Sequence, residues 1–343
     1  MGRKPTGRPT SFDIAYAAGV SQPTVSRALR GDRSVSEQTR QKIQQIARDL
    51  NYTVDKNASS LRSQRSNTIA LLFFEDPTPD ESMINPFFLA MLGSITRACA
   101  DRGLDLLISF QRMEDDWHVK YQDSHRADGL ILLGYGDYTT YTPKLEKLVA
   151  QGTHYARWGS VSLDSSGATV GTDNVDAGRL VGRHLLEIGK RQIAFLGEAD
   201  ETCPEFLGRF TGLREVTEDA GLPPPPRFDA ITTEEAGYCA ARKLLESGAN
   251  CDAIFAASDL IAIGAMRALA DAGKKVPDDI AVVGFDDIPA ASLTTPPLTT
   301  VTQDVRGAGE SLVDALLSQI ADREVTPHKL AGKLVIRGST AQS

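Results

Sequence analysis

The sequence lacks the features of secreted, membrane-spanning and metal-binding proteins. It has only four cysteines among 343 residues, with no Cys-x-x-Cys pair and no neighbouring histidine: Cys99, Cys203, Cys239 and Cys251. Single scattered cysteines are typical of buried, reduced thiols in a cytosolic protein. No apolar run approaches the roughly 18 residues of a membrane span, and no apolar segment follows the basic N-terminus as in a secretory signal. We therefore expect a cytoplasmic protein that makes no membrane contact.

Common catalytic motifs are also missing. The sequence has no Gly-x-Ser-x-Gly, no P-loop, no Gly-x-Gly-x-x-Gly after a strand pattern and no His-Glu-x-x-His, and its five histidines are not clustered. We expect no catalytic residue, no metal site and no cofactor, and hence a protein that is not an enzyme. A sugar-binding protein of an uptake system is disfavoured too, because such a protein would begin with a signal peptide and not with a basic segment.

Charge is distributed unevenly along a chain of ordinary globular composition, 41% hydrophobic and 24% charged. Residues 1–66 carry 12 Lys/Arg against 5 Asp/Glu, a formal charge of +7, whereas the remainder has 25 against 40, a charge of −15. A basic head on an acidic body attracts a polyanion at one end only. A solubilising tail would carry the same charge, so the sequence pattern of residues 1–66 is needed to distinguish it from a domain that binds a polyanion.

Three helix patterns follow a basic arm, residues 1–9. Thr10 starts a capping pattern, Thr-Ser-Phe-Asp, and Gly19 ends the first helix because glycine adopts a left-handed conformation without strain. Ser21 caps a second helix over Gln22–Leu29, and Ser36 caps a third. A glycine turn between two short helices predicts a helix-turn-helix domain over residues 10–54. A generic three-helix bundle has the same periodicity but leaves the polar, basic outward face of the second helix unexplained.

This head resembles the DNA-binding domain of the lactose/galactose repressor (LacI/GalR) family through the strings AGVSQPTVSRAL, VSEQTR and LNY. The resemblance implies that Gln22 and Pro23 occupy the two base-reading positions and that Arg27 acts from the same helix. Glutamine pairs with adenine, whereas proline offers only apolar contact. Four further candidates are expected to contact phosphate or to pack in the core: Thr10, Thr24, Ser26 and Tyr52. Ser21, which caps the second helix, is also a DNA-binding candidate.

Residues 55–66 match the hinge helix and linker of that family. By analogy Leu61 is the wedge that enters the minor groove and kinks the central base step, with Ala58 beside it. An ordinary polar linker with one incidental leucine is the alternative. The arm before the head, which contains Gly-Arg-Pro, is either a minor-groove contact or a disordered basic tail.

From residue 67 onward, short apolar runs alternate with amphipathic stretches. The expected strands are Ile69–Phe74, Leu104–Phe110, Gly129–Leu133, Gln192–Gly197, Ala253–Ala257 and Ile280–Phe285, and the expected helices include Phe87–Arg102, Ala177–Ile188, Ala236–Glu246, Ile261–Ala272 and Gly307–Ile320. Alternating strands and helices predict parallel sheets, which bind ligands beyond the carboxyl ends of their strands. Carboxylates, Arg157 and aromatic residues follow strands of this pattern and suit a polyhydroxylated ligand, although the carboxylates could instead cap helices.

Strings such as VGTDN, RFTGL and VVGFDDIP resemble the regulatory domain of the same family, which has the two-lobed periplasmic-binding-protein fold. The resemblance implies a first lobe of residues 67–172 and 303–331 and a second lobe of residues 173–302 and 332–343. It makes Arg209 and Asp286 the main effector-binding pair. Further candidates are the aromatics of the first lobe and a serine of the second: Phe87, Phe88, Trp158 and Ser258. The register of residues 112–126, RMEDDWHVKYQDSHR, stays open.

The sequence thus predicts a repressor with an all-α head and an α/β body. The expected partners are double-stranded, pseudo-palindromic operator DNA, a second copy in a homodimer, and a small effector, most simply a sugar that releases the DNA. The alternative is a corepressor-dependent regulator that binds a purine or another non-sugar metabolite.

Overall fold

The computed structural model describes residues 9–29, 31–52, 65–74, 84–134, 137–161 and 167–340. The chain divides into two compact units, Met1–Ser66 and Asn67–Ser343. We call these units the head and the body. No helix of the described residues is long and apolar enough to cross a membrane.

The described residues of the head contain three helices around one small core. They are α1 (Ser11–Ala18), α2 (Gln22–Leu29) and α3 (Glu37–Asp49). Gly19 ends α1 in the left-handed conformation (φ 70°), as predicted. The buried side chains come from all three helices and from the α2–α3 connection: Ile14, Ala15, Ala18, Val25, Ala28, Val35, Ile43 and Ala47. These short helices are therefore stabilised by mutual packing rather than by length.

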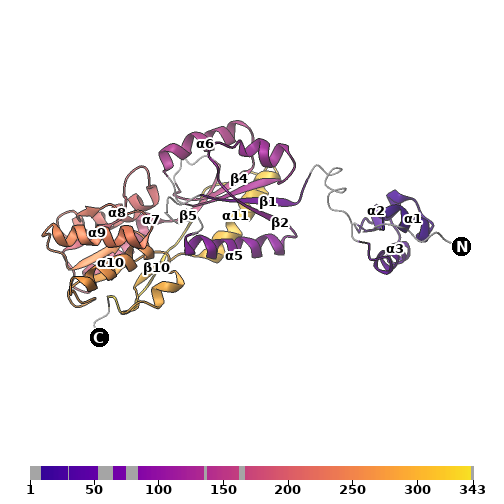
Figure 1. Ribbon diagram of the computed structural model, residues 1–343. Helices are drawn as coiled ribbons and strands as arrows, with labels where there is room; N and C mark the ends of the chain where they lie inside the picture. The colour runs from indigo at the N-terminus through magenta and orange to yellow at the C-terminus, as the bar shows by residue number, and fades with distance from the viewer. Residues whose placement is uncertain are drawn as a thin grey trace. The chain divides into compact units, whose positions relative to one another are not determined.

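The body is built on two parallel sheets (Figure 1). The first has the strand order β11-β5-β4-β3-β1-β2: β1 (Thr68–Phe73), β2 (Asp105–Phe110), β3 (Gly129–Leu133), β4 (Tyr155–Trp158), β5 (Ala168–Thr172) and β11 (His328–Leu330). The second has the order β7-β6-β8-β9: β6 (Ile193–Leu196), β7 (Arg227–Phe228), β8 (Ala253–Ala256) and β9 (Ala281–Val283). We call the parts around them the first and the second lobe. The predicted fold of parallel sheets in two lobes is confirmed.

Helices cover both faces of the first sheet, with α6 (Tyr138–Ala150) on one face and α5 (Pro86–Asp101) and α11 (Val305–Ile320) on the other (Figure 1). Strand alternation explains this arrangement, because successive side chains of a strand point to opposite faces. In β1, Leu71 and Phe73 belong to the core cluster that contains α5 and α11, whereas Ala70 and Leu72 belong to the cluster that contains α6. Four helices accompany the second sheet: α7 (Asn174–Glu187), α8 (Pro204–Asp219), α9 (Glu234–Glu246) and α10 (Asp259–Asp271).

The chain passes between the two sheets three times. It does so between β5 and α7, between β10 (Thr300–Thr302) and α11, and between β11 and β12 (Lys333–Val335). Strands β10 and β12 pair with each other antiparallel, so two of the three passages run side by side. Polar groups close to these passages are therefore well placed to respond when the lobes move relative to each other.

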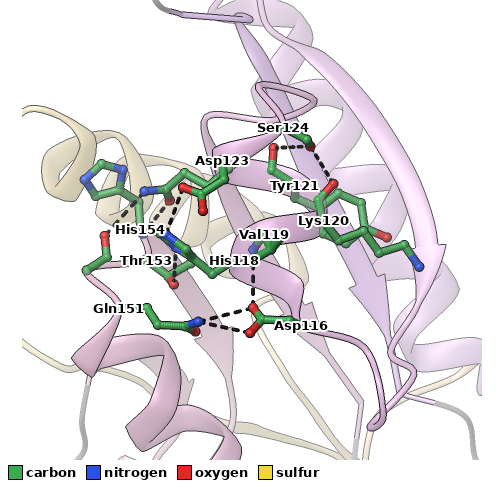
Figure 2. A network of polar contacts seen from close by, with 12 residues as sticks. Asp116, His118, Val119, Lys120, Tyr121, Asp123, Ser124, Gln151, Thr153 and His154 are labelled. Carbon is green, nitrogen blue, oxygen red and sulfur yellow. Dashed lines mark hydrogen bonds and ion pairs between the residues drawn. The ribbon is translucent and has the colours of Figure 1, made fainter.

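Residues 112–126, whose register the sequence left open, contain the π-helix η1 (His118–Asp123). Figure 2 shows how its polar groups bind the turn between α6 and β4. His118 lies between the Asp123 carboxylate (3.1 Å from Nε2) and the Thr153 hydroxyl (2.9 Å from Nδ1). Asp116 accepts hydrogen bonds from Gln151 and from the backbone N–H of Val119. A π-helix is rare, and here these tertiary contacts compensate for its wide turn.

Some details differ from the sequence-based expectation. Cys99 is buried, but Cys239 is exposed on α9, so the prediction that all four thiols are buried is wrong. Most strand and helix ends differ by one to three residues, and α6 and α8 had not been predicted as helices. The helix α6 has a central proline, Pro143, which obscures its helical pattern in the sequence.

Candidate functional site

The N-terminal end of α1 is held by a capping box. The backbone N–H of Asp13 donates to Thr10 Oγ1, and the Asp13 carboxylate accepts from the backbone N–H of Thr10 at 2.8 Å. Thr10 itself is exposed, so its hydroxyl lies at the surface of the head. The structure thus gives Thr10 a local structural role and leaves it at a surface where a phosphate can approach.

The recognition candidates lie on α2. Ser21, Pro23 and Arg27 are exposed, and Gln22 is half-buried, with its Nε2 donating to Ser11 Oγ at 3.2 Å. The Ser21 hydroxyl caps the helix by accepting from the backbone N–H of Thr24. These side chains therefore form one polar surface at the N-terminal end of α2, continuous with the start of α1.

The other predicted contacts of the head are less exposed. Thr24, Ser26 and Tyr52 are half-buried, and Tyr52 packs against the head core. Ala58 and Leu61 lie outside the described residues, so their predicted role in the minor groove stays a prediction. Sequence reasoning passed over two exposed aromatic residues of α1, Phe12 (71% exposed) and Tyr16 (92% exposed). Their spacing of four residues is the signal that could have revealed a shared helix face.

In the body, Arg209 on α8 is almost completely buried. Its Nε donates to Asn174 Oδ1 at 2.9 Å, its Nη1 donates to the carbonyl of Ala257, and its guanidinium lies 3.6 Å from the centroid of the Phe285 ring. Neutral groups and an aromatic face therefore hold the guanidinium in one orientation. A planar fork of donors fixed in this way suits vicinal hydroxyl groups.

Asp286 follows Phe285 and is buried as well. It has a positive φ of 111°, an uncommon conformation for a residue with a side chain, and it accepts a hydrogen bond from Gln303 Nε2 at 2.7 Å. Gln303 Oε1 in turn accepts from the Thr172 hydroxyl at 2.5 Å. Thr172 ends β5 and Gln303 follows β10, so Asp286 is linked by hydrogen bonds to two of the chain passages between the lobes.

Two buried carboxyl groups lie in this region. Burial raises the pKa of Asp286 to about 7, although the positive charge of Arg209 and the hydrogen bond from Gln303 oppose the rise. Burial and the neighbouring Asp286 also raise the pKa of Asp259 well above its ordinary value. Asp259 accepts from the Thr300 hydroxyl at 2.6 Å and from the backbone N–H of Ile288 at 2.9 Å. It therefore acts chiefly as a structural bridge beside Asp286.

A polar pocket with aromatic walls lies between the two lobes. Its lining comes from the carboxyl ends of strands in the first lobe, from α6 and from the first turn of α8: Phe74, Leu132, Gly134, Tyr138, Tyr141, Arg157, Trp158 and Glu205. The lobes touch here, because the backbone N–H of Tyr138 donates to the carbonyl of Thr202 at 2.9 Å and that of Ser160 donates to Glu205 at 2.7 Å. Glu205 lies four residues before Arg209 on α8, so the pocket and the Arg209 group adjoin.

The predicted effector residues are only partly brought together. Trp158 lines the pocket, and the Phe87 ring packs behind it with 5.8 Å between the ring centroids. Phe88 is buried in the core beside Phe87. Ser258 is completely buried and caps α10 by accepting from the backbone N–H of Ile261. Phe88 and Ser258 therefore have clear structural roles, and their contact with an effector stays a prediction.

Sequence reasoning missed several polar groups of this site. Asn174 and Gln303 orient Arg209 and Asp286, and Tyr138, Arg157 and Glu205 line the pocket. Arg157 had been noted at the end of a strand, which was the available signal, but it had not been selected as a binding residue. In the described part of the chain, no three His, Cys, Asp or Glu side chains are grouped as metal ligands would be.

Comparisons with known proteins agree with this architecture. Residues 12–55 match the model of bacterial regulatory proteins of the lacI family, and residues 183–340 match that of the periplasmic binding protein-like domain. The chain is 32% identical over 329 residues to the ribose operon repressor of Escherichia coli (strain K12), which covers 94% of this chain and 96% of that protein.

Solved structures of similar proteins cover both units. A lac repressor dimer bound to operator and the anti-inducer ONPF has a TM-score of 0.82 and 26% identity and covers 98% of this chain and 100% of that chain. A complex of the transcriptional regulator CelR with cellobiose has a TM-score of 0.71 and 29% identity and covers 97% of this chain and 100% of that chain. The similarity thus extends over head and body together.

Proposed function

Because the chain belongs to the LacI family of bacterial regulatory proteins, it is a DNA-binding transcriptional regulator and not an enzyme, and we propose that it represses sugar-utilisation genes until a sugar binds between its lobes. We assign residues 1–9 to a basic arm, 10–54 to the DNA-binding domain and 55–66 to the hinge. The first lobe then comprises residues 67–172 and 303–331, and the second lobe residues 173–302 and 332–343. We also propose that the protein is cytoplasmic, because operator DNA in bacteria lies in the cytoplasm.

On the DNA side, the proposal rests on the polar surface at the start of α2. The half-buried Gln22 is tied to Ser11, and the exposed Arg27 lies further along the same helix. We assign base recognition to Gln22 and Pro23, and phosphate contacts to Thr10, Ser21, Thr24, Ser26 and Tyr52. The charge of +7 over residues 1–66 supplies the attraction to DNA that does not depend on sequence.

On the effector side, the observation that carries the proposal is the buried pair of donors and acceptors at Arg209 and Asp286. A sugar hydroxyl both donates and accepts, so one ring can satisfy both residues. Trp158 supplies an aromatic face for the apolar side of a sugar ring. A purine corepressor is the alternative, because a purine also stacks on aromatic rings, but it has fewer groups that donate and accept at once.

The coupling follows from where Asp286 lies. Its hydrogen bond to Gln303, and that of Gln303 to Thr172, reach residues beside two passages between the lobes. An effector that binds one arrangement of the lobes more tightly shifts the population towards it, by no more than its difference in affinity for the two arrangements. We propose that the DNA-bound homodimer prefers the arrangement that binds sugar less well.

The test is an operator-binding titration of the full chain, read by fluorescence anisotropy with and without a panel of sugars and nucleobases. One sugar is expected to weaken operator binding at least tenfold and to raise the melting temperature. A ligand at about 100 times its Kd adds roughly 2.7 kcal/mol of stability. Tighter operator binding caused by a nucleobase would instead establish the corepressor alternative. Operator affinity that does not fall with rising salt would contradict the proposed phosphate contacts.

The proposed homodimer needs an apolar surface in the first lobe. Strand β2 is an edge strand of the first sheet, with Ile108 52% exposed, and α5 packs beside it with Leu89 47% exposed. Exposed apolar side chains on an unpaired edge favour association with another chain. We therefore place the dimer contact on α5 and β2.

A further inference from the structure

Arg157 is a buried cation that has no anionic partner among the residues that the structure describes. It belongs to β4, its side chain is only 3% exposed, and it lines the pocket between the lobes. Within the described residues, no carboxylate oxygen lies within 4.0 Å of its guanidinium nitrogens. Its partners are neutral: Nη2 donates at 3.3 Å to the Tyr138 hydroxyl and at 3.3 Å to the carbonyl of Ser160.

These contacts compensate the buried charge only in part. Both hydrogen bonds are long, and the Tyr138 ring lies 5.2 Å from the guanidinium. The buried Nε has no hydrogen-bond partner among the described residues. Taking a guanidinium out of water costs free energy unless an opposite charge or a full set of hydrogen bonds replaces the water. The pocket is therefore incomplete without a further acceptor, and a negatively charged one satisfies Arg157 best.

The acidic side chain that lines this pocket does not fill this role. Glu205 lines the same pocket, but its Oε1 accepts from the backbone N–H of Ser160 at 2.7 Å. Between Glu205 and Arg157 lies Gly159, where a Cβ would be 2.7 Å from Arg157 Nη1 and 3.2 Å from Glu205 Oε1. The glycine leaves open the space between the two charged groups. Glu205 is then available to accept from a ligand hydroxyl.

We propose that the effector is a monosaccharide that carries an anionic group, a carboxylate or a phosphate, and that this group pairs with Arg157. The inference rests on the proposed function, since it specifies the sugar that binds in the cleft. The planar guanidinium forms two parallel hydrogen bonds with either anion. The sugar ring then lies against the aromatic side chains of Tyr138 and Trp158, and its hydroxyls reach Glu205 and the adjoining Arg209 group.

The experiment measures ligand binding to the full chain by isothermal titration calorimetry at constant ionic strength. The probes are D-glucuronate and D-galacturonate for the carboxylates, and D-glucose 6-phosphate and D-ribose 5-phosphate for the phosphates. Each is compared with its neutral parent sugar. At least one anionic probe is expected to bind ten times or more tighter than its parent, and the two sets of probes show which anion the pocket takes.

Substitutions of Arg157 test whether this residue causes the preference for anionic over neutral sugars. Arg157→Gln, of similar size and without charge, is expected to reduce the affinity for the anionic probe at least tenfold and to change that for the neutral parent less than threefold. Arg157→Lys keeps the positive charge but lacks the two parallel N–H donors of the guanidinium, so its affinity for the anionic probe should be intermediate. Arg242→Gln, an exposed arginine on α9 that pairs with Glu246, is the matched control and should bind like the parent protein. Thermal melting verifies that each variant is folded.

The outcomes separate this inference from the proposed function. A neutral sugar that binds as tightly as every anionic probe and releases the operator overturns the role of Arg157 and leaves the sugar-regulated repressor intact. If neither neutral nor anionic sugars bind, both proposals are wrong. Equal loss of anionic and neutral binding in Arg157→Gln also overturns the inference, because the arginine would then only shape the pocket.

Discussion

At the scale of the residue, buried polar groups of the body depend on one another more than on their own sequence neighbours. Arg209 is oriented by Asn174, and Asp286 by Gln303, both from distant parts of the chain. Removing one partner leaves the other buried and unsatisfied, which typically costs about 1–3 kcal/mol or more when a charge is involved. Single substitutions here therefore report on groups that lie far apart in the sequence.

The buried Asp286 makes stability depend on pH. Because its pKa is about 7 in the folded body and near 3.8 when exposed, the folded state binds more protons than the unfolded state between about pH 4 and pH 7. The free energy of unfolding therefore falls as pH rises through this window. Asp286→Asn should show a flatter melting temperature from pH 4 to pH 7 in calorimetric scans, whereas Asp219→Asn, at an exposed position on α8, should follow the parent protein. Parallel curves for the parent and Asp286→Asn would show that Asp286 is already ionised at low pH.

Gln22 is expected to read a base of the operator. Gln22→Ala should cost about 1–3 kcal/mol of operator affinity and relax the preference at one base pair, because a bidentate contact to adenine is lost. Selection from a randomised operator library, followed by sequencing, measures the base preference at each operator position. The control is Gln38→Ala, which removes an exposed glutamine of α3. An unchanged selected motif for Gln22→Ala would show that its hydrogen bond to Ser11 is its whole role.

At the scale of the element, the sequence predicted a helix or strand correctly where the contacts that stabilise it join residues close together in the sequence. The capping box of α1 and the glycine at its end lie within a few residues of each other, so the sequence was sufficient there. The π-helix η1 could not be predicted, because its His118 and the preceding Asp116 bind the distant turn between α6 and β4. Helix α8 was missed although its RFTGL string was recognised, since its buried face includes the polar Glu205 and Arg209.

The edge strand β2 and helix α5 carry the proposed dimer contact. Ile108→Asp should place a charge in an apolar interface and convert the dimer to monomers, and operator affinity should fall at least tenfold because two half-sites must be held together. Sedimentation velocity and operator titration measure the two effects. Val149→Asp is the matched control, because Val149 is similarly exposed but lies on α6, on the other face of the sheet. If Ile108→Asp remains a dimer, the dimer interface does not involve β2 and must lie on another surface.

At the scale of the whole molecule, the order of strands and helices was predictable, but the composition of the cleft was not. Asn174 and Gln303 lie far along the chain from Arg209 and Asp286, and each reaches its partner only in the folded body. Arg157 was visible at a strand end, yet its lack of an anionic partner within the described part of the chain is a property of the tertiary structure. Sequence patterns identify candidates at strand ends, and only their spatial arrangement selects among them.

Communication between effector and DNA requires the full chain, and Arg209 is expected to be necessary for it. Once a releasing sugar is identified, the ratio of operator affinities without and with that sugar gives the response. In Arg209→Ala this ratio should fall to about one, because the fixed fork of donors is lost and the buried neighbours Asn174 and Asp286 are left without it. Arg267→Ala, an exposed arginine of α10 that pairs with Glu235, should keep the parent ratio. A variant Arg209→Ala that melts much lower but still responds to the sugar would show that the arginine only supports the second lobe, and the effector would then have to bind through the pocket of Trp158 and Arg157 alone.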